Sequence, residues 1–357
     1  MAASLGSTEP LYDSPDANVD IIFVHGLHGD RKKTWTKLPT KDHPNPVFWP
    51  QELLPRKCKT ARVLSFGYNA SVAHFYPLYG PKRVPPETTV DNHSIALLDS
   101  LVGFRESTGT SDRPLFFIAH SLGGLVCANA VSRVCRSDKK RENLAKQVRG
   151  MIFLGTPFAG SKIALWAESG LRFISLFSET NKMKLKDLQE GSKILADINH
   201  EFARYIKSRD RDPPSVEIAC YYEEYPTKGT FVVDKSSAIL SGVDPLSIEE
   251  EHSHMGKFQD EHRSGFISIT NKLNSWINAL DLNLDASPDT SPDASPDADA
   301  GTGTDVDTLE KYYTTQMGDI HYHQAISNNH GVITGHIATT AANGISIVGC
   351  VTNNYGA

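Results

Sequence analysis

The sequence predicts an α/β fold, in which a mostly parallel β-sheet carries helices on both of its faces. Short apolar runs recur between residues 20 and 233, and the first four of them end in Gly or a small polar residue, as expected of buried strands. Between these runs lie stretches with apolar residues at helical spacing, and strands that alternate with helices form parallel sheets. The segment that shows both patterns is long enough to bury such a core.

Each expected element follows from one of these two patterns. Apolar residues recur at helical spacing in 122–135 and again in 264–280, so both segments are expected to be helices packed on the sheet. The apolar runs expected to be strands are, in chain order, Asp20–Val24, Arg62–Phe66, Leu115–Ala119, Gly150–Leu154, Val216–Tyr222 and Thr230–Val233.

Composition divides the chain into four parts. An N-terminal extension, 1–18, precedes the α/β domain, 19–282, which is followed by a linker, 283–307, and a tail, 308–357. The linker contains seven Asp and no Lys or Arg, and Ser-Pro-Asp occurs in it three times at a spacing of four residues. Such a segment has almost nothing apolar to bury and its like charges repel, so we expect a disordered spacer.

Charge and cysteine content exclude several classes of protein. The 357 residues include 36 Lys and Arg against 42 Asp and Glu, and the net charge of −6 makes nonspecific binding to nucleic acid unexpected. No run approaches the roughly 18–20 apolar residues that a membrane span needs, and the first residues lack the basic and apolar regions of a secretory signal. The five cysteines are scattered and lack CxxC spacing, which favours a reducing compartment and a cytoplasmic location. We expect no metal and no cofactor.

A strand, a serine and a helix follow one another directly in LFFIAHSLGG, residues 115–124. In this arrangement a sharp turn forces the serine into a strained backbone conformation and exposes its hydroxyl above the sheet. Only small residues fit at the positions two before and two after the serine, and Ala119 and Gly123 meet that demand. Ser121 is therefore the candidate nucleophile, and the Leu122 N–H is a candidate donor to a developing oxyanion.

A second turn, VHGLHG at 24–29, follows the first predicted strand. Hydrolases of this architecture present their second oxyanion donor at this place, and we assign that role to the Leu27 N–H. We expect His25 to brace the turn through hydrogen bonds.

The base is expected to be a late histidine, because this architecture orders its triad as Ser, acid and His. Of the histidines between the last predicted strand and the linker, His252 and His254 lie in a loop before the final helix, whereas His262 falls at the start of that helix. The acid should follow the penultimate strand. Glu223 is the first carboxylate after VEIACYY, Asp234 is its rival, and Asp244 is a weaker candidate.

The motifs together resemble one group of α/β-hydrolases, the lipase and serine-esterase-like domains found in fungal NACHT and other NLR-type receptors and as free-standing partners of them. More distant relatives are the mitochondrial and ER serine-active-site proteins. The resemblance covers residues 19–280 and implies His252 as the base and Glu223 as the acid. The strings that carry it are VHGLHGD (24–30), FWPQELLP (48–55), ARVLSFGYNA (61–70), FFIAHSLGGLV (116–126), FLGTPFAGS (153–161), YYEEYPT (221–227), VVDKSSAIL (232–240) and EHSHMGKF (251–258).

The resemblance implies a serine esterase or lipase that acts as an effector in fungal NLR-type immune or cell-death signalling, with an ester or lipid substrate. On activation, such an effector is expected to make peripheral contact with a membrane. Two alternatives stay open. The first alternative is a catalytically silent interaction module that keeps the hydrolase fold, and the second is a housekeeping phospholipid-remodelling esterase.

The tail has an unusual composition, because residues 320–357 contain no Asp, Glu, Lys, Arg or Pro. Asn, Thr, Gly and alternating β-branched residues dominate it, and these are features of segments that stack into cross-β ladders. The layout of this chain resembles that of hydrolases in the group named above. The resemblance implies a prion-like, amyloid-type motif that self-assembles and templates with a matching motif on an NLR-type receptor. A hairpin docked on the hydrolase, or disorder, is the alternative.

Overall fold

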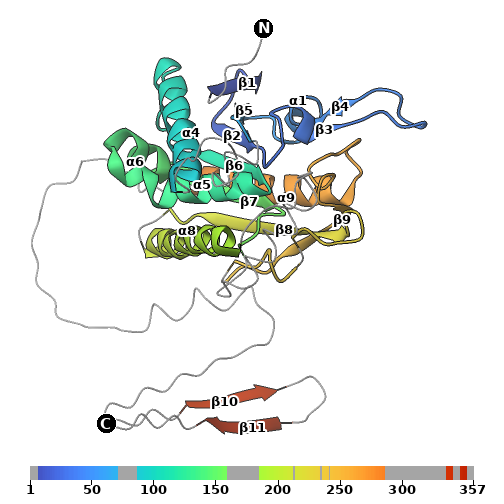
Figure 1. The fold of residues 1–357 in the computed structure, drawn as a ribbon. Helices are drawn as coiled ribbons and strands as arrows, with labels where there is room; N and C mark the ends of the chain where they lie inside the picture. The colour runs from blue at the N-terminus through green and yellow to red at the C-terminus, as the bar shows by residue number, and fades with distance from the viewer. Residues whose placement is uncertain are drawn as a thin grey trace, which may run out of the picture. The chain divides into compact units, whose positions relative to one another are not determined.

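A seven-stranded sheet with strand order β1-β5-β2-β6-β7-β8-β9 forms the centre of the fold (Figure 1). β1 runs antiparallel to β5, and every other neighbouring pair is parallel, which confirms the predicted mostly parallel sheet. The strands are β1 (Ser7–Asp13), β2 (Val19–Val24), β5 (Ala61–Gly67), β6 (Leu115–His120), β7 (Val148–Leu154), β8 (Glu217–Tyr225) and β9 (Leu246–Glu251).

The computed structural model describes residues 7–70, 87–158, 185–211, 214–233, 235–240, 242–285, 335–340 and 346–351. The chain forms two compact units, Met1–Pro288 and Asp289–Ala357. Within the second unit the described residues are two strands, β10 (Gly335–Thr340) and β11 (Ser346–Val351), which pair antiparallel with Gly335 opposite Val351. Residues 286–307 of the expected linker lie outside the described residues, as does the rest of the expected tail.

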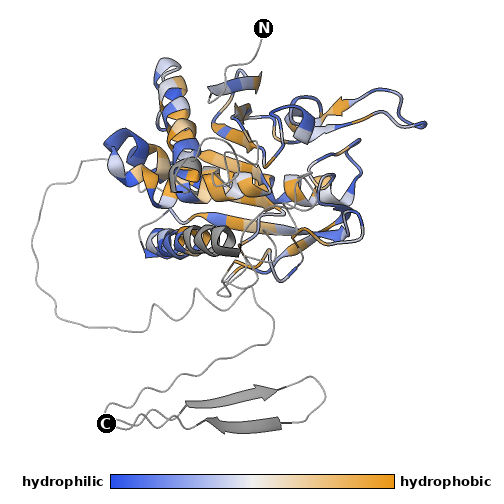
Figure 2. Ribbon diagram, in the orientation of Figure 1, coloured by the Kyte–Doolittle hydropathy of each residue, from blue (hydrophilic) through white to orange (hydrophobic). Residues whose placement is uncertain are grey.

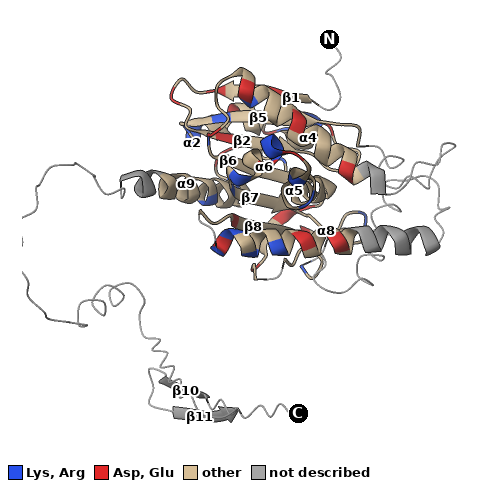
Figure 3. Cartoon of the chain, turned by 90° about the vertical axis from the view of Figure 1, so that its left-hand side faces the viewer, with Lys and Arg blue, Asp and Glu red and all other residues tan. Residues whose placement is uncertain are grey.

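Helices cover both faces of the sheet, and each face has its own apolar core. Successive residues of β2 alternate between the two cores: Ile22 joins the core beneath α4, α5, α6 and α8, whereas Ile21 joins the core beneath α1, α2 and α9. This explains why the central strands are mostly apolar, as Figure 2 shows, while charged residues lie on helices such as α8 in Figure 3. The helices are α1 (Trp49–Glu52), α2 (Leu54–Lys57), α4 (Glu87–Ser107), α5 (Leu122–Ser132), α6 (Lys139–Lys146), α8 (Leu185–Arg211) and α9 (Ser264–Asp285).

Both predicted helices are present. α5 is buried along its whole length, since it packs between the sheet and its helical neighbours. It ends at Ser132, just before the short 3₁₀ turn η2 (Val134–Ser137). A second described 3₁₀ turn, η1, spans Lys33–Trp35. α9 places Phe266, Ile269 and Leu273 on the sheet. A short two-stranded ribbon of β3 (Thr36–Lys37) and β4 (Val47–Phe48) completes the described elements. None of the described helices combines the length and the apolar character needed to cross a bilayer.

The two edges of the sheet differ from the prediction. β1 lies within the expected N-terminal extension, and its burial is partial, so the sequence shows no apolar run there. The expected strand at Thr230–Val233 is wrong, because this segment forms a loop and the last strand is β9. Val232 and Val233 are buried, but their N–H groups bind a side chain rather than a neighbouring strand. β9 escaped prediction because it ends in three Glu, a composition suited to an exposed edge.

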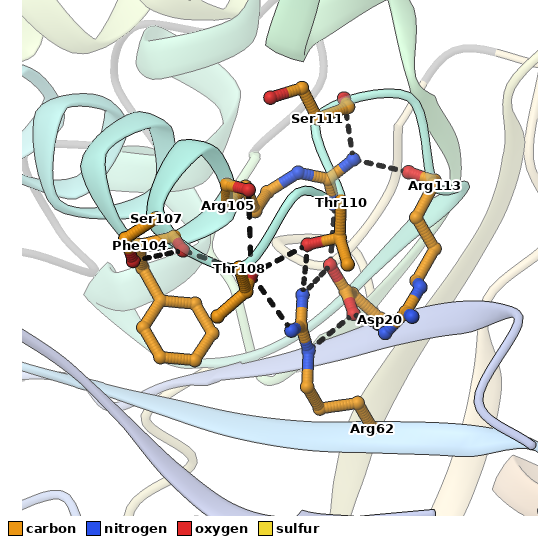
Figure 4. A network of polar contacts seen from close by, with 9 residues as sticks. All are labelled: Asp20, Arg62, Phe104, Arg105, Ser107, Thr108, Thr110, Ser111 and Arg113. Atoms are coloured by element: carbon orange, nitrogen blue, oxygen red, sulfur yellow. Dashed lines mark hydrogen bonds and ion pairs between the residues drawn. The ribbon is translucent and has the colours of Figure 1, made fainter. Parts of the chain in front are cut away.

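A buried ionic network ties the first strand of the parallel region to α4 (Figure 4). The carboxylate of Asp20 accepts two hydrogen bonds from Arg62, at 2.8 and 2.9 Å, and one from Arg105 at 2.6 Å. All three side chains are at most 2% exposed, and Arg113 adds a longer contact of 3.3 Å. Because buried guanidinium groups need a partner, this network depends on Asp20.

Replacing Asp20 with Asn is expected to lower the free energy of unfolding by about 3–5 kcal/mol, because it leaves two buried guanidinium groups without a countercharge. Urea denaturation measures the change. Asp99→Asn is the matched control: its carboxylate pairs with Arg141 but is 54% exposed, so the expected loss is below about 1 kcal/mol. Equal losses in the two variants would contradict the assigned role of the buried network.

Candidate active site

Ser121 lies at the turn between β6 and α5, with φ of 56° and ψ of −132°. A non-glycine residue in this region stores strain of order 1–3 kcal/mol, so surrounding contacts must hold it. The Ser121 N–H donates to the Leu154 carbonyl at 2.8 Å, and the Ser121 carbonyl accepts from the Gly124 N–H and the Thr156 hydroxyl, each at 3.0 Å. The strained strand–serine–helix turn expected from the sequence is therefore present in the backbone.

Two glycines allow the neighbouring turn to approach Ser121. A Cβ added at Gly26 would lie 2.6 Å from the Ser121 Cβ, and one added at Gly123 would lie 2.3 Å from the His25 carbonyl oxygen. Real Cβ atoms do not approach other atoms so closely, so both positions need the absence of a side chain. The close contact brings Leu27, the residue after Gly26, to the same edge of the sheet as Leu122. Leu122 is the first residue of α5, where an N–H has no carbonyl partner within the helix.

His25 braces this turn, as expected. Its Nδ1 donates to the Gly26 carbonyl at 3.1 Å, its Nε2 faces the Tyr68 N–H at 3.4 Å, and the Tyr68 hydroxyl donates to the His25 carbonyl at 2.7 Å. The two rings stack, with centroids 4.4 Å apart. Burial lowers the pKa of His25 to about 4, so the imidazole stays neutral near pH 7 and serves as a fixed hydrogen-bonding group.

His252 follows β9 directly and is 1% exposed. Its Nδ1 lies 2.9 Å from Oε2 of Glu223, which is equally buried. The other carboxylate oxygen, Oε1, accepts hydrogen bonds from the backbone N–H groups of Val232 and Val233, the second at 3.1 Å. The loop that was expected to be a strand therefore holds the acid in place.

The remaining candidates lie elsewhere. His254 is 44% exposed and pairs with Glu251 at 3.0 Å, and His262 is exposed in the turn before α9. Asp244 is exposed, and Asp234 lies outside the described residues. Glu223 was expected just after its strand, but β8 continues to Tyr225, so this carboxylate projects from the strand itself.

The turn after β7 was not identified as part of the site from the sequence. Gly155 has φ of 58°, and a Cβ added there would lie 2.8 Å from Cε1 of His252. The next residue, Thr156, binds the Ser121 carbonyl, so one turn contacts both the serine and the histidine. The Gly-Thr-Pro string at the end of a buried strand was the available signal, but its contacts join residues far apart in the chain.

This geometry suits nucleophilic catalysis. With Nδ1 directed at Glu223, the imidazole of His252 keeps Nε2 for exchange of a proton with a hydroxyl group. The expectation that the turn exposes the Ser121 hydroxyl is wrong, because the side chain is 1% exposed in the ligand-free chain. Within the described part of the chain, the hydroxyl oxygen is buried and has no hydrogen-bond partner. Catalytic hydrogen bonds are often long in a ligand-free state and shorten when substrate binds. Among the described residues, no group of three or more His, Cys, Asp and Glu is arranged to hold a metal ion.

The family model described as "Putative serine esterase (DUF676)" matches residues 95–195, which include Ser121 and Thr156. The chain is also 25% identical to Protein SERAC1 of Homo sapiens and 26% identical to Protein SERAC1 of Mus musculus over 260 residues, which is 68% of this chain and 37% of each relative. It thus spans well under half the length of these curated relatives. The match to the serine-esterase family model supports the expectation of an ester-hydrolysing enzyme.

Two solved structures resemble the chain at low sequence identity. A soluble variant of monoglyceride lipase from Saccharomyces cerevisiae, in complex with a substrate analogue, has 14% identity and a TM-score of 0.43, covering 76% of this chain and 90% of that one. The Pyrococcus furiosus esterase Pf2001 has 11% identity and a TM-score of 0.39, with coverage of 74% and 81%. The α/β-hydrolase fold itself follows from the strand order and the serine turn described above.

Replacing Glu223 with Gln is expected to reduce ester hydrolysis by about 10²–10⁴-fold, because the amide no longer stabilises a protonated His252 or fixes its tautomer. The measurement is kcat on a p-nitrophenyl ester. Glu224→Gln makes the same chemical change at the next, exposed position and should leave kcat near the wild-type value. Similar losses in both variants would remove Glu223 from the triad.

Proposed function

We propose that this chain is a serine hydrolase that cleaves carboxylic esters through Ser121, His252 and Glu223. The single observation that carries the proposal is the strained Ser121 turn beside a buried His252–Glu223 pair at one edge of the sheet. The match to a serine-esterase family model over residues 95–195 supports the same reaction class.

In the proposed mechanism, the Ser121 hydroxyl attacks the ester carbonyl while His252 takes its proton. Glu223 stabilises the imidazolium that forms, and the Leu27 and Leu122 N–H groups donate to the oxyanion. His252 then returns the proton to the departing alcohol, which leaves an acyl group on Ser121. Water, deprotonated by His252, releases the acid and restores the serine.

The wider role that we propose is that of an effector in NLR-type signalling, recruited or assembled through its tail. The composition of residues 320–357 and the antiparallel pairing of β10 with β11 support a segment able to extend into cross-β ladders. The family model ends at residue 195 and does not bear on this segment.

One observation favours a second candidate, a catalytically silent module that signals by assembly. Ser121 is only 1% exposed, and its hydroxyl forms no hydrogen bond with any described residue. A chain whose Ser121 stays closed off from substrate would fold correctly but would not hydrolyse an ester. Reaction with a small electrophile separates the two candidates, because a silent site does not trap it.

The nucleophile is tested by replacing Ser121 with Ala. The wild-type chain should hydrolyse p-nitrophenyl esters and be labelled covalently by a fluorophosphonate probe, and the variant should do neither, because it lacks the attacking oxygen. Ser132→Ala is the matched control, since that serine is buried at the far end of α5 and donates to the Ala128 carbonyl. Unchanged labelling of Ser121→Ala would refute the proposal, whereas an unlabelled wild-type chain would favour the silent module.

Deleting residues 308–357 is expected to abolish filament formation while ester hydrolysis stays within about two-fold of the full chain, because the proposed site lies wholly before the linker. Electron microscopy and thioflavin fluorescence report the filaments. A chain whose tail is shuffled at constant composition separates strand register from composition alone. Persistent filaments in the deletion would assign assembly to the hydrolase unit.

A further inference from the structure

His120 closes β6 and immediately precedes Ser121. Its side chain is buried, and its Nε2 lies 2.8 Å from the backbone carbonyl oxygen of His252. The two imidazole rings are 5.0 Å apart between centroids and tilted by 43°. The nucleophile's own strand therefore contacts the loop that carries the candidate base, although 132 positions separate the two residues in the chain.

The direction of this hydrogen bond follows from its chemistry. A carbonyl oxygen can only accept, so Nε2 of His120 must carry the proton. Burial lowers the pKa of His120 to about 3, and the neighbouring His252 adds to this effect, so the imidazole is neutral near pH 7. A neutral donor can hold the backbone of His252 without repelling the positive charge that the His252 ring acquires during catalysis.

Other hydrogen bonds of the same loop involve the carbonyl groups of different residues. The N–H groups of His254 and Met255 both bind the Glu251 carbonyl, at 2.9 and 3.0 Å, and these bonds only shape the turn locally. Trp49 reaches the loop through its indole N–H but binds the carbonyl of Gly256, at 2.8 Å. The bond from His120, in contrast, acts on the backbone of His252 itself.

We propose that His120 is a positioning residue, which holds the His252 backbone so that the imidazole lies correctly between Ser121 and Glu223. The inference rests on the proposed hydrolase function and deepens it. The steric demand of the turn falls on Ala119 and Gly123 and does not explain why a histidine stands directly before the nucleophile. The proposal gives that histidine a role. Misplacing a reacting group by about 1 Å can cost about 10²-fold in rate, which sets the expected scale.

Three substitutions test the hydrogen bond. His120→Gln can place its amide Nε2 where the imidazole Nε2 lies, His120→Asn is too short to reach, and His120→Leu fills space without a donor. We expect kcat on a p-nitrophenyl ester to fall about 30–100-fold in the Leu and Asn variants, with KM within about two-fold, and to recover most of this loss in the Gln variant. The rate of fluorophosphonate labelling should follow kcat.

A matched control separates positioning from stability. The Ser94 hydroxyl is fully buried, lies 2.8 and 2.9 Å from the Val90 and Val126 carbonyl oxygens with its one proton to share between them, and accepts a hydrogen bond from the Asn129 amide at 3.0 Å. Ser94→Ala should therefore lower Tm and leave kcat near the wild-type value. If His120→Leu does not fold, the comparison of Gln with Asn carries the test. Equal kcat in those two variants, whether high or low, would overturn the positioning role.

The outcomes distinguish this inference from the function on which it rests. An active wild-type chain, an inactive Ser121→Ala chain and a fully active His120→Leu chain would overturn the role of His120 alone. A wild-type chain that neither hydrolyses esters nor reacts with the probe would overturn both the proposed function and the role of His120.

Discussion

Ser121 has a backbone conformation that L-residues avoid, and the arrangement of the site depends on holding it there. The hydrogen bond to Leu154 anchors its N–H, and those from Gly124 and Thr156 anchor its carbonyl. The absent side chain of Gly26 lets the adjacent turn come within contact. These restraints come from three different segments, so the strain at a single residue is balanced by the packing of strand ends against one another.

The candidate acid shows a similar division of work. Glu223 uses one carboxylate oxygen to bind the N–H groups of Val232 and Val233, and directs the other toward His252. A loop that looks like a strand in the sequence is thus held as a loop by the acid that it positions. The carboxylate is fixed at both oxygens, which reduces the freedom it would lose in stabilising a protonated imidazole.

The parallel sheet makes this convergence unavoidable. Each parallel strand delivers its carboxyl end to one edge. β2, β6, β7 and β9 therefore lead into the segments that contain Leu27, Ser121, Thr156 and His252, and β8 carries Glu223 near its own carboxyl end. At the start of β2, the Asp20 network fixes the sheet to α4, and apolar cores on both faces keep the strands in register. Stability and candidate chemistry therefore occupy different ends of the same strands.

Features with local causes are predictable from the amino-acid sequence: the central strands, the helices beginning at Leu122 and Ser264, and the serine turn each depend on side chains close together in the chain. Features with long-range causes emerge only when the chain folds. Folding pairs Glu223 with His252 rather than with the half-exposed His254, a choice that the spacing left open and only the family resemblance implied. Folding also places β1 and β9 at edges with little apolar signal. It also makes a loop of Thr230–Val233. The physical reason is that a buried carboxylate competes with a neighbouring strand for the same backbone donors, and a one-dimensional pattern does not record which of them is within reach.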